Sequence, residues 1–194
     1  MKNILFLSAV TFFACSCKKN EGTVPPASDD FNTGTTWVYK YTNYDAAGAI
    51  ISSANMTLSI TGQQIVAGDT WWVASSAGAP TFIRKTSAGY HTIQNNVSQL
   101  QFKLPAAVND TWRVTYSNAA GDYGDYKVLA LNENVTVPMG TIACYFAEAY
   151  DSNSLEDKVW YNDANLLVKQ EQYDDDGSGT MYKDFSLELV SFIP

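Results

Sequence analysis

The chain has 194 residues, of which 46% are hydrophobic, 13% aromatic and 16% charged, a composition that supports one folded domain and excludes a disordered protein. Twelve Lys and Arg against 20 Asp and Glu give a net charge of −8. That charge argues against nucleic acid as a partner, because phosphate contacts need clustered basic side chains, and three cysteines are too few for a disulfide scaffold.

The chain begins with the features of an export signal. A short basic start that contains Lys2 precedes a mostly apolar run over residues 4–14. A membrane-spanning helix needs about 20 apolar residues to cross a hydrocarbon layer of about 30 Å, so this run is too short to span. A basic start, a short apolar run and small residues after it are typical of a cleaved signal peptide.

A cysteine follows the apolar run. Ser16-Cys17-Lys18-Lys19 resembles the lipobox of bacterial lipoproteins, in which the chain is cut before a cysteine that carries the lipid, and Cys-Lys-Lys is common in Bacteroidetes-type lipoproteins. Cys15 is the competing position, but Phe13 two residues before it suits a small cleavage pocket poorly. Cys17 is therefore the predicted lipidation site, with a plain secretory signal as the alternative. Several acyl chains give stable anchoring where one gives marginal binding.

The expected organisation has three parts: a signal peptide over 1–16, a lipidated cysteine and flexible tether over 17–34, and a single all-β domain over 35–194. The tether is rich in Pro, Ser, Asp, Asn, Thr and Gly, a composition typical of linkers. Once Cys17 carries lipid, Cys144 is the remaining thiol of the mature chain and has no partner for an internal disulfide. An apolar strand-like run surrounds Cys144 and predicts a small buried side chain.

Alternation with a period of two dominates the domain. Aromatic or aliphatic residues recur at every second position over 37–41, 56–60, 100–104, 112–116 and 185–189. This alternation is typical of half-buried β-strands, and turn residues separate the segments. About ten strands with short links predict an antiparallel all-β fold. So many strands must curl to protect their edges, which favours a curved half-barrel or open barrel, with a β-sandwich as the alternative.

Three short motifs occur in order along the domain. They are Phe31-Asn32-Thr33-Gly34-Thr35-Thr36-Trp37-Val38-Tyr39, then Val137-Pro138-Met139-Gly140-Thr141, then Trp160-Tyr161 followed by Leu167-Val168-Lys169. Together they resemble a group of uncharacterised bacterial lipoproteins. The resemblance implies a curved β domain similar in style to periplasmic lipoprotein carriers, and it brings no catalytic residues. Leu166 stands where that group usually has Gly, and neighbouring Asn165 is expected to supply the left-handed residue instead.

Two adjacent tryptophans are the candidate ligand-binding residues. Trp71 and Trp72 fall in one strand, so their side chains point to opposite faces of the sheet. An exposed Trp is a platform for a sugar ring or a lipid chain. On a sheet whose two faces are both covered, the pair needs no ligand.

Other candidate chemistry is incomplete. Asp174, Asp176 and Ser178 match the start of a Ca²⁺ loop, but position 12 is Phe185, where a Glu is required. The segment therefore predicts a polar hairpin turn and no cofactor, with adventitious Ca²⁺ binding as the alternative. His91 is the sole histidine; as a general base it would need an adjacent nucleophile and an orienting acid, and the sequence contains no Gly-x-Ser-x-Gly elbow. A hydrolase would need spatially paired carboxylates, for which the strand residues Glu148, Glu171 and Glu188 are the candidates.

Charge is distributed unevenly along the domain. Residues 35–119 carry five bases and three acids, whereas residues 120–194 carry four bases and 14 acids. A solvated acidic surface explains this distribution, and so does a preference for cationic partners.

The sequence as a whole predicts a non-enzymatic lipoprotein anchored in the outer membrane that binds an apolar or carbohydrate ligand or a partner protein. The alternative is a lipid or lipoprotein carrier with a concave apolar face.

Overall fold

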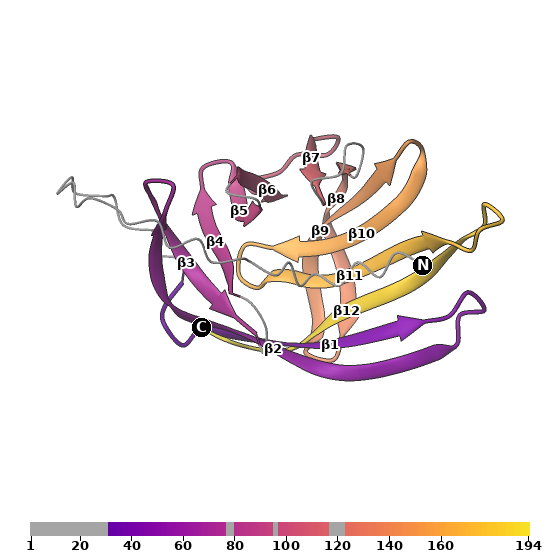
Figure 1. The fold of residues 1–194 in the computed structure, drawn as a ribbon, viewed down its shortest axis with the longest axis horizontal. Helices are drawn as coiled ribbons and strands as arrows, with labels where there is room; N and C mark the ends of the chain where they lie inside the picture. The colour runs from indigo at the N-terminus through magenta and orange to yellow at the C-terminus, as the bar shows by residue number, and fades with distance from the viewer. Residues whose placement is uncertain (1–30, 77–79, 95–96, 117–122) are drawn as a thin grey trace.

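A computed structural model describes residues 31–76, 80–94, 97–116 and 123–194, so the signal, Cys15, Cys17 and most of the tether lie outside the described residues. The described residues form twelve strands (Figure 1). The strands are β1 (Thr36–Tyr44), β2 (Ile50–Val66), β3 (Asp69–Ser75), β4 (Thr81–Thr86), β5 (Gly89–Gln94), β6 (Val97–Lys103), β7 (Thr111–Thr115), β8 (Tyr123–Val137), β9 (Gly140–Asp151), β10 (Ser154–Asn162), β11 (Leu166–Asp175) and β12 (Met181–Ile193). Within the described residues, no helix is long and apolar enough to cross a membrane.

All twelve strands belong to one antiparallel sheet. Its order is β6-β5-β4-β3-β2-β1-β12-β11-β10-β9-β8-β7. Strands that are consecutive in sequence therefore pair, except β6 and β7, which are the two edges of the sheet, and β12 pairs with β1. The sheet curls until its two end strands, β6 and β7, approach each other (Figure 1). The fold is a nearly closed barrel with one open seam, which confirms the all-β antiparallel prediction.

The strand count is twelve, where the sequence analysis expected about ten. The polar run Asn132-Glu133-Asn134 lies within β8, and the register of β8 against β9 shifts between Val128 and Ala130 and again before Glu133. Each bulge interrupts the period of two from which a strand is inferred. β4 has only six residues and offers too short an alternation to stand out.

Side chains hold the seam together where backbone pairing stops. The backbone N–H of Thr115 donates to Oε1 of Gln99 at 2.9 Å, and Nε2 of Gln94 donates to the carbonyl of Tyr116. At the other end of the seam, Nζ of Lys103 lies 3.2 Å from Oδ2 of Asp110. These contacts tie β5 and β6 to β7 and its flanking residues without a β-ladder.

Aromatic side chains fill the barrel interior. Tyr161 stacks on Phe102 with ring centroids 5.1 Å apart, and Trp112 meets it edge-on at 6.3 Å. Trp112 in turn stacks on Tyr126 at 5.1 Å. The Trp112–Tyr126 pair joins the adjacent strands β7 and β8, whereas the two contacts of Tyr161 join β10 to the edge strands β6 and β7. Burial of this aromatic surface holds the curled sheet closed.

Phe31 packs in the same core, ahead of the expected domain start at Thr35. It is 5% exposed and meets Trp37 edge-on at 5.7 Å. A tight turn positions Phe31 in the core. The N–H of Asn32 donates to Oγ1 of Thr35, and the N–H of Thr35 donates back to the carbonyl of Asn32. Gly34 adopts a φ of +100° within this turn. The Phe-x-x-Gly-x-x-Trp spacing therefore places two rings against each other through one turn.

The turn before β11 differs from the expectation. Leu166 itself adopts the left-handed conformation, with a φ of +64°, so the prediction that Asn165 supplies it is wrong. Oδ1 of Asn162 accepts hydrogen bonds from the N–H groups of Ala164 and Asn165, which fixes the preceding turn. The carbonyl of Asn165 accepts a hydrogen bond from Nε1 of Trp37 at 3.0 Å. This contact ties the turn to the barrel core at the residue before the left-handed Leu166.

Candidate functional site

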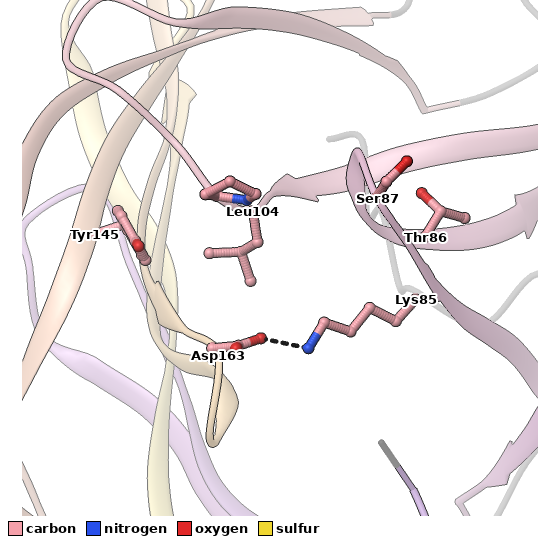
Figure 2. Close-up of a pocket in the computed structure, with 7 residues that line it drawn as sticks. Lys85, Thr86, Ser87, Leu104, Tyr145 and Asp163 are labelled. Atoms are coloured by element: carbon pink, nitrogen blue, oxygen red, sulfur yellow. Dashed lines mark ion pairs between the residues drawn. The ribbon is translucent and has the colours of Figure 1, made fainter. Parts of the chain in front are cut away.

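A pocket of about 260 Å³ opens at one end of the barrel (Figure 2). Its walls come from the β4–β5 hairpin, the link between β6 and β7, strand β9 and the β10–β11 turn. The lining residues are Lys85, Thr86, Ser87, Leu104, Pro105, Tyr145 and Asp163. The pocket exists because barrel closure brings together two sides of the sheet that are distant in sequence.

An ion pair spans the pocket from one side to the other. Nζ of Lys85 lies 2.8 Å from Oδ1 of Asp163, and Figure 2 shows the two side chains reaching toward each other. Lys85 also lies over the ring of Tyr90 at 5.5 Å, and the hydroxyl of Tyr90 donates to the carbonyl of Asp163 at 3.2 Å. The Asp163 side chain is 65% exposed, so solvent screens the pair and its net contribution to folding is about 0–1 kcal/mol.

The apolar part of the pocket continues into the core. Tyr145 stacks on Tyr161 with centroids 5.4 Å apart, and Leu104 is 5% exposed. Burial raises the pKa of Tyr161, so its hydroxyl stays neutral and donates to the carbonyl of Lys103 at 3.3 Å. The pocket therefore combines an aromatic and aliphatic wall with an ammonium, a carboxylate and three residues that carry hydroxyl groups.

His91 has hydroxyl partners but no orienting acid. Its Nε2 lies 3.1 Å from Oγ1 of Thr86, and its Nδ1 lies 3.2 Å from Oγ of Ser98. Burial, and then the charge of Arg84, lower the pKa of His91, so the ring is neutral near neutral pH. Oγ1 of Thr86 also accepts the N–H of Ala88 within the hairpin turn, which gives it a structural use.

The sequence analysis missed a buried carboxylate inside the barrel. Asp157 is 3% exposed, and its Oδ2 accepts hydrogen bonds from the hydroxyls of Tyr126 at 2.7 Å and Tyr116 at 3.1 Å. Oδ1 accepts a third bond from Nε2 of Gln170 at 3.0 Å. Burial raises the pKa of Asp157 against the opposing effect of these donors. The alternation that places Val159 and Tyr161 inward also places Asp157 inward, so this signal was available.

The two candidate tryptophans are both buried, and neither lines the pocket. Trp72 is 8% exposed and meets Phe31 edge-on at 6.4 Å within the core. Trp71 is 3% exposed on the opposite face, with the guanidinium of Arg84 5.9 Å from its ring. Their role in ligand binding stays a prediction.

The Asp174–Ser178 segment forms a turn stabilised by its own hydrogen bonds. Oδ1 of Asp176 accepts the N–H of Ser178 at 2.8 Å and its hydroxyl at 2.6 Å, and these bonds lower the pKa of Asp176. Within the described ranges, no group of three or more His, Cys, Asp and Glu side chains is placed to hold a metal ion. The adventitious Ca²⁺ site stays a prediction.

The glutamates considered for hydrolysis lie in ion pairs. Glu148 pairs with Lys158 at 3.6 Å, and Glu171 pairs with Lys169 at 3.0 Å. Glu188 lies 4.0 Å from the same Lys169. None of the three lines the 260 Å³ pocket.

Comparison with known proteins finds similarity only to solved structures. No family model matches the chain, and no curated protein matches it. A crystal structure from Parabacteroides distasonis ATCC 8503, provisionally described as a lipoprotein, is similar to this chain with a TM-score of 0.40 and 16% sequence identity. The similarity covers 84% of this chain and 96% of that chain. At this level it carries no inference about function.

Proposed function

We propose that this chain is a lipoprotein of the outer membrane, anchored through lipid on Cys17, whose β domain is a non-catalytic module that binds a small carbohydrate. The sequence around Cys17 supports the anchor: a short apolar run, a small residue before the cysteine and two lysines after it. The β domain supplies the argument for the ligand.

The observation that carries the ligand class is the pocket at the end of a filled barrel. Pockets for drug-sized ligands span roughly 300–1,000 Å³. This pocket, of about 260 Å³, lies just below that range, so it suits a single sugar ring better than an acyl chain. A sugar presents an apolar ring face and several hydroxyl groups. Tyr145 and Leu104 match the ring face, and Lys85 and Asp163 match the hydroxyls.

The filled interior argues against the alternative of a lipid carrier. A carrier needs a large dry cavity, whereas Phe102 and Trp112 both pack against Tyr161 where that cavity would lie.

The partners of His91 argue against catalysis. Its Nε2 comes within hydrogen-bond distance of the Thr86 hydroxyl, but the second ring nitrogen meets the hydroxyl of Ser98. An activated hydroxyl needs a base that is oriented by a further group, commonly an acid.

The test is a titration of the detergent-solubilised mature lipoprotein with free hexoses, hexosamines and N-acetylhexosamines, followed by calorimetry or ligand-observed NMR. At least one sugar should bind with a Kd of about 1 mM or lower, equivalent to about −4 kcal/mol or tighter. Asp163→Asn should weaken that binding about tenfold or more, because hydrogen bonds to charged groups contribute about 1.5–3 kcal/mol.

Asp69→Asn is the matched control. Asp69 also forms a 2.8 Å ion pair, with Arg84, and it is absent from the pocket lining. Equal loss in the two variants, or no binding of any sugar, would contradict the proposal. Phospholipid that copurifies at one molecule per protein and resists detergent exchange would favour the carrier instead.

A further inference from the structure

The β1–β2 hairpin presents two adjacent isoleucines to solvent. Ile50 is 65% exposed and Ile51 is 67% exposed. Single exposed apolar residues are common on protein surfaces, but two large neighbours at one tip form a small apolar patch. The register of β1 against β2 shifts between Asn43 and Tyr44, which leaves Ile51 as the extra residue of the bulge. Bulges re-aim side chains, so strict alternation does not send the two isoleucines to opposite faces.

The turn that holds the two isoleucines is ordered by its own hydrogen bonds. The N–H of Asp45 donates to the carbonyl of Ala49 at 2.9 Å. Oδ1 of Asp45 accepts the N–H groups of Ala47 at 3.0 Å and Ala49 at 2.8 Å. The apolar patch is therefore held in place before any partner arrives, which reduces the entropy lost on binding.

Carboxylates surround this end of the barrel. The β1–β2 and β11–β12 hairpins end at the same side of the molecule (Figure 1). Asp174 is the cross-strand neighbour of Tyr182. The pKa of Tyr182 is raised, first by desolvation and then by the charges of Asp184, Asp174, Asp176 and Asp45. Carboxylates from both hairpins therefore lie within electrostatic reach of the Tyr182 hydroxyl.

The nearby cation is already neutralised. Nζ of Lys183 lies 4.6 Å from the ring of Tyr44 and 3.5 Å from Oε1 of Glu171. Glu171 also pairs with Lys169, which in turn lies 4.0 Å from Glu188. The two lysines and two glutamates of this network balance in charge, so the carboxylates at the hairpin tips keep a net negative field. Anionic phospholipid headgroups are repelled by such a field, whereas Lys and Arg side chains are attracted to it.

We propose that Ile50 and Ile51, with the acidic rim of Asp45, Asp174, Asp176 and Asp184, form a docking surface for a cationic, apolar segment of a partner protein. The isoleucines bury against the apolar side chains of the segment, and the rim attracts its bases. Charge complementarity selects this occupant over a bilayer. The surface lies on other residues than the sugar pocket and stands independently of it.

The probe is a short synthetic peptide of alternating Lys and Leu, titrated against the detergent-solubilised mature lipoprotein, with an alternating Glu and Leu peptide of equal length as the control. We expect the Lys–Leu peptide to bind with an affinity that falls as salt rises, and the Glu–Leu peptide not to bind. Ile50→Ser combined with Ile51→Ser should weaken binding about tenfold or more. Asp174→Asn combined with Asp176→Asn should weaken it severalfold and flatten its salt dependence.

Ile65→Ser supplies a matched control, since Ile65 is 59% exposed near the other end of β2. An equal loss in Ile65→Ser, or equal binding of both peptides, would overturn the proposal. Amide hydrogen exchange over residues 45–52 tests the bilayer as occupant, with the lipoprotein in phosphatidylglycerol vesicles and in detergent micelles. Equal exchange rates in vesicles and micelles agree with a protein partner. Slower exchange in vesicles would overturn the proposal in favour of a membrane contact.

Discussion

The hydroxyl of Tyr126 donates a 2.7 Å hydrogen bond to Oδ2 of Asp157 inside the barrel. Tyr116 donates to the same oxygen, and the two hydroxyls lie 3.1 Å apart. Because the carbonyl of Tyr116 also accepts Nε2 of Gln94 across the seam, Asp157 indirectly holds the two edges of the sheet together. A carboxylate is usually costly to bury, and here three donors offset that cost.

Stability should depend on the ionisation of Asp157. Its pKa is raised in the folded state, so the unfolded chain loses this proton at lower pH than the folded chain does. Between the ordinary pKa of about 3.9 and the raised folded value, the folded state binds more protons, and the free energy of unfolding falls as pH rises. Asp157→Asn removes this contribution. Urea unfolding at several pH values should show the difference between wild type and variant moving in favour of the variant as pH rises through this window.

A constant difference across that window would contradict the assignment. Asp157→Ala provides the second comparison, because it removes the acceptor shared by two tyrosine hydroxyls. One hydroxyl can then donate to the other, but the second is left without an acceptor. Each unsatisfied group costs about 1–3 kcal/mol, so Asp157→Ala should be less stable than Asp157→Asn at every pH.

Gly124 is predicted to be required by the ring of Tyr116. A Cβ atom at Gly124 would clash with Oη of Tyr116 and lie 2.9 Å from Cζ. Gly124→Ala should therefore lower the free energy of unfolding by about 1–3 kcal/mol, the usual cost of overpacking. Tyr116→Phe removes Oη, so Gly124→Ala should cost less in that background. A double-mutant cycle by urea unfolding measures the coupling, and additive effects would contradict the predicted clash.

The two core tryptophans Trp37 and Trp112 should respond differently to substitution by Phe. Nε1 of Trp37 donates to the carbonyl of Asn165 at 3.0 Å, whereas the buried Nε1 of Trp112 has no hydrogen-bond partner in the part of the chain that the structure describes. Trp112→Phe removes an unsatisfied donor, which offsets the lost packing by about 1–3 kcal/mol. Trp37→Phe breaks a hydrogen bond and leaves a buried carbonyl. We expect Trp37→Phe to be the more destabilising by at least about 1 kcal/mol in urea unfolding, and the reverse order would contradict this account.

Cys144 should be unreactive in the folded protein. It is 1% exposed, and burial followed by the charge of Glu133 raises its pKa to about 12, so little thiolate forms near neutral pH. Maleimide should leave the native protein unlabelled and should label it in denaturant. Labelling of native protein at Cys144, located by peptide mass, would show that the thiol is accessible.

Much of the barrel follows from the sequence because each hairpin is a local structure. Trp37, Tyr39 and Tyr41 alternate along β1, and Leu187 and Leu189 do so along β12, so each strand is recognisable alone. The pairing of β1 with β12 joins the two ends of the domain, and alternation within a strand does not encode such a partner.

The candidate site was less accessible to sequence reasoning. Lys85 lies near the end of β4 and Asp163 in the β10–β11 turn, and only closure of the sheet brings their charged atoms to 2.8 Å. Trp71 and Trp72 drew attention as an adjacent aromatic pair, but packing on both sides of the sheet buries both. Asp157 shares the inward face of β10 with Val159 and Tyr161, and the sequence analysis did not consider the polar residue on that face.

The envelope assignment depends on lipid at Cys17, and intact mass spectrometry of the membrane-extracted protein tests it most directly. Wild type, Cys17→Ala and Cys15→Ala are measured side by side. We predict that wild type and Cys15→Ala begin at residue 17 with a mass increase equal to the acyl groups, and that Cys17→Ala lacks this increase. An unacylated, soluble wild-type protein would contradict the lipoprotein assignment and leave the β domain as a secreted binding protein.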